Sequence, residues 1–152
     1  MFGRIQKDCL NRKGLIPLFQ YLEKEKYKLA ICSSSHSEYV QTLVNTVSYP
    51  LQFETIIGRD MVKYAKPNPD IFLLGAKVLD VNPKECLVSE DSKAGILAAK
   101  KAGMHSIFIE DTIKVDNDFK EAIDFKLDSL LDVVDLLEEN KHVGTMENFM
   151  QR

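Results

Sequence analysis

An apolar run that ends in two adjacent carboxylates most limits what this chain can fold into. Cys86-Leu87-Val88 leads to Glu90 and Asp91, and a segment rich in small residues follows and stops at Gly103. The pattern predicts a buried parallel strand that carries both acidic side chains at its carboxyl end. Open α/β sheets bind their ligands at this edge. A bound cation at this edge would stabilise the two carboxylates. The alternative interpretation is that Glu90 and Asp91 cap the amino end of the following helix.

Short apolar runs alternate with segments of helical period along the rest of the chain. The expected strands are 27–32, 53–58, 86–88, 105–109 and 125–127, and helices are expected from Leu15, after Ser35, from Asp70 to Leu79, after Asp91 and after Ser129. A capping box of Ser35 and Glu38 should begin the second helix. This alternation predicts one α/β domain with a doubly wound, three-layer, Rossmann-like parallel sheet. We place the core at residues 14–140, a flexible tail at 141–152, and the end of a preceding segment at 1–13.

Composition excludes several classes of partner. The 152 residues carry a formal net charge of −3 and no long basic run, which argues against nucleic acid and anionic membranes. No apolar stretch approaches the roughly 20 residues of a membrane span, and the first residues do not resemble a secretory signal. Cys32 and Cys86 fall in expected strands, where small buried thiols are typical. A reduced, cytoplasmic protein is the expectation.

Polar side chains lie directly after three of the expected strands. Ser33 follows one strand, Lys66 lies in the loop after the next, and Glu90 and Asp91 follow a third. Taken singly, Ser33 is typical of a turn or cap and Lys66 of a solvated loop. Taken together, a hydroxyl before an open helix N-terminus, a lysine and paired carboxylates suit phosphoryl transfer with Mg²⁺.

These residues also resemble the motifs of a known family. Ser33, the stretch K-P-N-P-D-I-F at 66–72 and the stretch E-D-S-K-A-G at 90–95 resemble motifs two, three and four of the haloacid dehalogenase-like superfamily. The resemblance covers about residues 14–137. It is closest to the branch of sugar-phosphate phosphatases and β-phosphoglucomutases.

The resemblance implies a role for each site residue. Ser33 and the amide of Ser34 would bind the transferring phosphoryl group, and Lys66 would neutralise that group and steady the nucleophile. Glu90 and Asp91 would hold Mg²⁺. Ser33 and Lys66 are therefore the expected catalytic residues of this chain.

The chain departs from the family at its first motif. No apolar strand ending in D-x-D-G-T is present, although the family takes its nucleophile and its general acid–base from that motif. Asp116-Asn117-Asp118 has the spacing, but it lacks the preceding strand and the following Gly-Thr. The absent strand would lie at the centre of the sheet, between the strands that end at Ser33 and Glu90. Residues 1–13 would then be the remnant of a cap domain that is otherwise missing.

Two functions follow as expectations. The first is the core of a Mg²⁺-dependent phosphatase or phosphomutase that acts, when complete, on a phosphorylated small molecule such as a sugar phosphate. The chain alone would then be inactive and would bind Mg²⁺ weakly or not at all. The alternative is a non-catalytic binding module, because the strands beside the gap offer edges to a strand-supplying partner or to a second copy in a homodimer. If those strands do not pair directly, a marginally stable monomer is expected.

Overall fold

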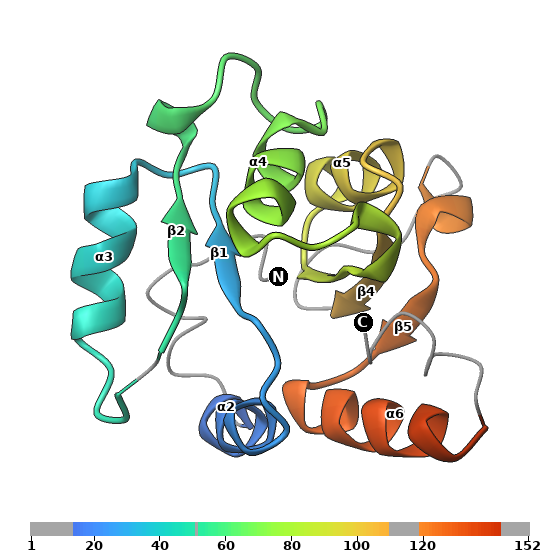
Figure 1. Cartoon of the computed structure of the whole chain (residues 1–152). Coiled ribbons are helices and arrows are strands. Elements are labelled where there is room, and N and C mark those ends of the chain that lie inside the picture. The colour runs from blue at the N-terminus through green and yellow to red at the C-terminus, as the bar shows by residue number, and fades with distance from the viewer. Residues whose placement is uncertain (1–13, 51, 110–118, 144–152) are drawn as a thin grey trace.

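A computed structural model describes residues 14–50, 52–109 and 119–143 of the chain (Figure 1). Its α-helices are α2 (Leu15–Lys24), α3 (Ser37–Asn45), α4 (Asp70–Leu79), α5 (Lys93–Lys101) and α6 (Leu130–Val143). Its strands are β1 (Ala30–Cys32), β2 (Thr55–Ile57), β3 (Leu87–Glu90), β4 (His105–Ile109) and β5 (Phe125–Leu127). Three short 3₁₀ turns complete it: η1 (Arg59–Met61), η2 (Pro83–Glu85) and η3 (Lys120–Ala122).

The strands form two parallel ladders. In the first ladder β1 pairs with β2, with Ile31 opposite Ile56. In the second, β4 lies between β3 and β5, with Val88 opposite Ser106 and Phe108 opposite Lys126. Within the described residues no strand pairing joins β1 to β3. The predicted parallel α/β sheet is confirmed, and the ladders separate between the two strands that the sequence places beside the missing one.

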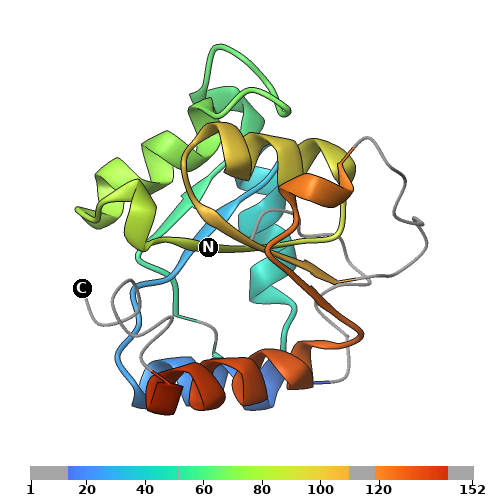
Figure 2. The ribbon, with the colours of Figure 1, turned by 90° about the vertical axis from the view of Figure 1, so that its right-hand side faces the viewer.

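Helices cover both faces of the sheet, as a doubly wound fold requires (Figures 1 and 2). On one face α4 packs against β1 and β2, and α5 packs against β3 and β4. On the other face α2 packs against α6, α3 contacts β2, and α6 contacts β5. Each face buries its own apolar cluster. The α4/α5 cluster includes Cys32, Ile57, Ile71, Phe72, Ala76, Val88 and Ala98, and the α2/α3/α6 cluster includes Leu15, Leu18, Phe19, Ile31, Val40, Leu43 and Leu137.

The sequence predicts most elements, with errors mainly at their ends. β1 and β2 are shorter than the apolar runs suggest, whereas β3 extends through Glu90. The expected capping box is wrong, because His36 and not Ser35 is the N-cap of α3 and its side chain accepts a hydrogen bond from the Glu38 amide. α6 continues to Val143, past the expected core limit at 140. The segments 1–13, 110–118 and 144–152, which include Asp116–Asp118, lie outside the described residues.

The two cysteines in the expected strands have the predicted environment. Cys32 and Cys86 are both buried and unbridged. Burial raises the pKa of the Cys32 thiol to about 12, so this side chain stays protonated and packs as a small apolar group. Among the described helices, none combines the length and the hydropathy that crossing a membrane demands.

The core predicts a clear difference between two leucines on helices. Leu18 is fully buried in the α2/α3/α6 cluster, whereas Leu73 on α4 is 41% exposed. Leu18→Ala should lower the free energy of unfolding by about 2–5 kcal/mol, because it leaves a cavity in a close-packed layer. Leu73→Ala should cost less than about 1 kcal/mol. Urea unfolding followed by circular dichroism measures both, and equal losses would contradict this packing.

Candidate active site

A buried ion pair joins two of the predicted site residues at the carboxyl edge of the sheet. Lys66 Nζ lies 2.7 Å from Glu90 Oε1, and the two side chains are 3% and 0% exposed. Lys66 comes from the loop between η1 and α4, and Glu90 is the last residue of β3. The expectation for Lys66 taken alone, a solvated loop lysine, is therefore wrong. A charged lysine is buried here because a carboxylate meets it.

The second oxygen of Glu90 is held by the start of α5. Ser92 Oγ donates to Glu90 Oε2 at 2.8 Å, and the Ser92 amide lies 3.3 Å from the same oxygen. Ser92 is also the N-cap of α5, where its side chain accepts a hydrogen bond from the Gly95 amide at 3.1 Å. The helix-cap interpretation of Glu90 and Asp91 is thus replaced by a serine cap. A Cβ atom on Gly95 would lie 2.0 Å from the Glu90 carboxyl carbon, so only glycine leaves room for this carboxylate.

Lys66 has further contacts that the sequence did not reveal. Its ammonium donates to the carbonyl oxygen of Cys32 at 3.0 Å, at the end of β1. It also lies 4.9 Å from the centre of the buried Phe72 ring, which suits a cation–π contact. Lys66 therefore connects the ends of β1 and β3, two strands that share no ladder.

Ser33 and Ser34 lie at the turn directly after β1. Ser33 is 1% exposed, and its amide donates to the Ile57 carbonyl at 2.9 Å. Its Oγ accepts a hydrogen bond from the Ser35 amide at 3.1 Å. The hydroxyl hydrogen of Ser33 therefore points away from this amide and can be donated to another group. Ser34 is exposed. Lys66 contacts the carbonyl of Cys32, the residue before Ser33, so the structure brings Lys66 and the Ser33 turn close together.

The amino end of α3 is not the open anion site that the sequence suggested. Both oxygens of Asp60, in η1, accept from Ser37: the amide donates at 2.7 Å and the hydroxyl at 2.6 Å. The next amide, that of Glu38, donates to His36 Nδ1 at 3.4 Å. The first turn of α3 is therefore occupied by protein groups.

Asp91 is the second carboxylate of the predicted metal site. It follows β3 directly and is partly buried, and its Oδ1 atom is fully buried. Both oxygens of Glu90 already accept hydrogen bonds, Oε1 from Lys66 and Oε2 from Ser92. No cluster of three or more His, Cys, Asp or Glu side chains occurs in the described part of the chain.

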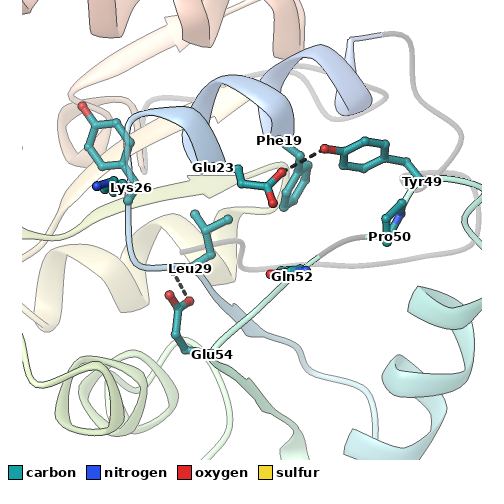
Figure 3. Close-up of a pocket in the computed structure, with 9 residues that line it drawn as sticks. Phe19, Glu23, Lys26, Leu29, Tyr49, Pro50, Gln52 and Glu54 are labelled. Atoms are coloured by element: carbon teal, nitrogen blue, oxygen red, sulfur yellow. Dashed lines mark hydrogen bonds between the residues drawn. The ribbon is translucent and has the colours of Figure 1, made fainter.

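A cavity of about 240 Å³ lies elsewhere, at the opposite edge of the sheet (Figure 3). Leu29 and Glu54, which directly precede β1 and β2, line it together with aromatic side chains from α2 and the α3–β2 connection. In this cavity the Leu29 amide donates to Glu54 at 2.6 Å, and the Tyr49 hydroxyl donates to Glu23 at 2.9 Å. None of the predicted site residues lines this cavity, so it is separate from the polar cluster at the carboxyl edge.

Comparison with known proteins identifies the family of this chain. The sequence profile of the haloacid dehalogenase-like hydrolases matches residues 4–109. The chain belongs to this family. It is similar to hexitol phosphatase A of Escherichia coli, with 35% identity over 96 residues that cover 63% of this chain and 44% of the relative. The predicted branch of sugar phosphatases and β-phosphoglucomutases is thereby confirmed.

Solved structures of the family share the fold. A structure assigned provisionally as a β-phosphoglucomutase from Thermotoga maritima has a TM-score of 0.76 and 26% identity, covering 84% of this chain and 60% of its own. CbbY from Rhodobacter sphaeroides in complex with xylulose-(1,5)bisphosphate has a TM-score of 0.71 and 28% identity. The match covers 82% of this chain and 59% of the CbbY chain. The chain spans about half or less of the curated relatives it matches.

The buried pair predicts strong coupling between Lys66 and Glu90. Lys66→Met or Glu90→Gln alone should lower the free energy of unfolding by about 3–5 kcal/mol, because each substitution leaves the remaining charge buried without its partner. The double variant should lose much less free energy of unfolding than the two single variants lose together. Urea unfolding of the unaltered chain, the two single variants and the double variant measures this coupling. Lys63→Met, in the exposed part of the same loop, is the control. Strictly additive losses would contradict the pairing.

Asp60 predicts a pH dependence with a definite sign. The hydrogen bonds from Ser37 lower the pKa of Asp60 below its ordinary value. The proton therefore binds the unfolded chain more tightly, and the contribution of Asp60 is present above the ordinary aspartate pKa of about 3.9. It is lost as pH falls through the lowered value.

Thermal melting from pH 7 to pH 3 tests this prediction. Asp60→Ala should melt below the unaltered chain at pH 7, and the difference should shrink at the acid end. Asp128→Ala, at an exposed aspartate, should show no such convergence. A difference that grows toward low pH would have the wrong sign.

Proposed function

We propose that this chain supplies the phosphate-binding and cation-binding side of a phosphatase or phosphomutase site that acts on a phosphorylated carbohydrate. The observation that carries the proposal is the buried Lys66–Glu90 pair, which holds an ammonium group at the sheet edge beside Ser33 and Asp91. A lysine fixed in this way offers positive charge to a phosphoryl group without a reorganisation cost. A surface lysine would have to be ordered first.

Each residue then has a defined task. The Ser33 hydroxyl and the Ser34 amide donate to phosphoryl oxygens, and Lys66 offsets the charge on the transferring group. Asp91, with support from Glu90, would hold Mg²⁺, which supplies further positive charge to the phosphoryl group when bound. Glu90 also orients Lys66, because its two oxygens contact Lys66 and Ser92.

The nucleophile comes from an additional strand. No apolar run of this sequence ends in D-x-D-G-T, and β1 and β3 belong to separate ladders in the described residues. We propose that a strand with this motif completes the site between them. Its first aspartate would attack phosphorus as the ester bond breaks, and its second would protonate the leaving oxygen.

The substrate class follows from the relatives. One relative is named as a hexitol phosphatase, and the CbbY structure contains a ketose bisphosphate. We therefore propose phosphorylated sugars or sugar alcohols as substrates. Transfer to water and transfer to a second sugar hydroxyl remain the two forms of the proposed reaction.

Complementation tests the proposal. The purified chain with Mg²⁺ and a hexitol phosphate should release no phosphate above background. Addition of a peptide with an apolar strand ending in D-x-D-G-T should restore release, and Lys66→Met or Asp91→Asn should abolish it. A peptide with asparagine in place of the first aspartate is the control. Turnover by the chain alone that persists in both variants would contradict the assigned roles.

The second candidate is a non-catalytic module that binds a partner strand. The separation of the β1 and β3 ladders favours it. The same experiment discriminates the two functions: binding of both peptides without phosphate release would support the module. Sedimentation of the chain alone tests the homodimer version, in which a second copy supplies the strand.

A further inference from the structure

Two backbone hydrogen bonds and one hydrogen bond to a side chain define the position of the turn that follows β1. The Ser33 amide donates to the Ile57 carbonyl at 2.9 Å, and the Arg59 amide donates to the Ser35 carbonyl at 2.9 Å. A third bond lies inside the turn, from the Ser35 amide to Ser33 Oγ at 3.1 Å. The Ser33–Ser35 turn is therefore held in place by the neighbouring turn between β2 and η1.

Asp60 fastens these two turns to α3. Its carboxylate accepts from the amide and from the hydroxyl of Ser37, at 2.7 and 2.6 Å, so a single residue of the first helical turn engages both oxygens. Gly58 makes the close approach possible, because a Cβ atom there would lie 2.3 Å from the Ser37 amide nitrogen. Two hydrogen bonds between the same two residues restrict rotation as well as distance.

The charge of Asp60 matters as much as its geometry. The amino end of a helix favours a negative charge, and the Asp60 carboxylate lies at that position on α3. His36 contributes a weaker contact, with Nδ1 3.8 Å from Asp60 Oδ1 and a side chain that is 60% exposed. A phosphoryl group at the sheet edge therefore finds this helix end already occupied by an anion.

We propose that Asp60 is a positioning residue for the phosphoryl group, which fixes the Ser33–Ser35 turn through Ser37 and fills the anion position of α3. The proposal rests on the proposed function, which places phosphate at Ser33. Phosphate is then confined to the Ser33 hydroxyl, the Ser34 amide and Lys66. Asp60 itself does not touch the substrate.

Two substitutions separate the geometry of Asp60 from its charge. Asp60→Asn keeps an oxygen that can accept from the Ser37 amide, and its NH₂ group can donate to the Ser37 hydroxyl. Asp60→Ala removes both contacts. Both variants lack the negative charge, so any difference between them reports geometry alone. Glu121→Gln, at an exposed residue of η3, is the matched control for loss of one negative charge.

Amide hydrogen exchange of the full chain is the first measurement. In Asp60→Ala the amides of Ser35 and Arg59 should exchange at least about tenfold faster, because the turns lose their anchor, whereas Asp60→Asn should stay close to the unaltered chain. Amides in the β3–β4 ladder, such as that of Ile107, should not change in either variant. Uniform acceleration across both ladders, or no acceleration in Asp60→Ala, would overturn the proposal.

Titration with inorganic phosphate is the second measurement, followed through the amide resonances of Ser33 and Ser34. Asp60→Ala should bind phosphate at least about threefold more weakly than Asp60→Asn, because the donors are no longer held in position. Equal affinities of the two variants would overturn the role of Asp60 while leaving the phosphate site intact. Absence of saturable shifts in the unaltered chain would contradict the proposed function itself, and the role of Asp60 with it.

Discussion

The Lys66–Glu90 ion pair is the interaction on which the candidate site depends. It stands where the sheet has no backbone connection, since β1 and β3 lie in separate ladders of the described chain. Burial of two charges is costly unless both are fully hydrogen-bonded. Here the ammonium meets Glu90, the Cys32 carbonyl and the Phe72 ring, and the carboxylate also meets Ser92. These contacts offset the desolvation of both groups and bring the ends of two strands together.

The same pair depends on precise packing by the two helices of one face. Phe72 lies in the first turn of α4 and is fully buried, so its ring is fixed beneath the ammonium. Gly95 lies in the first turn of α5, where its lack of a side chain admits the Glu90 carboxylate. The polar site is thus supported by α4 and α5 from below. A change in the packing of α4 would reach Lys66 through Phe72, and a change in the packing of α5 would reach it through Glu90.

The sequence predicts the parts of this arrangement that have a local signal. The helix from Asp70 to Leu79 follows from its prolines and its period, and the strand from His105 to Ile109 follows from its apolar run; both have the predicted bounds. The partners of Lys66 and Asp60 have no such signal. Glu90 is 24 residues from Lys66, and Ser37 is 23 residues from Asp60. Only the tertiary fold brings these pairs together.

The error at the start of α3 has the same origin. Ser35 and Glu38 have the spacing of a capping box, but the Ser35 amide is already bound to Ser33 Oγ and its carbonyl to the Arg59 amide. The chain turns once more before the helix begins, and His36 becomes the cap. Ser33, Lys66 and Glu90 lie at the carboxyl edge of the sheet, where their order along the chain predicts them, and their roles stay predictions. Their contacts with one another could not be inferred from that order.

Charge balance at this edge gives a physical reason for a divalent cation. The Lys66–Glu90 pair is neutral as a whole, so Glu90 offsets part of the positive charge that Lys66 offers to a phosphoryl group. Asp91 adds a negative charge next to the pair, and Asp60 takes the amino end of α3, where a phosphate would otherwise gain from the helix dipole. These fixed charges sum to a net negative charge, so they should weaken the binding of a phosphate dianion at Ser33. A divalent cation held by Asp91, as proposed, would offset this negative charge, and on this ground phosphate binding by the complete site should be coupled to metal binding.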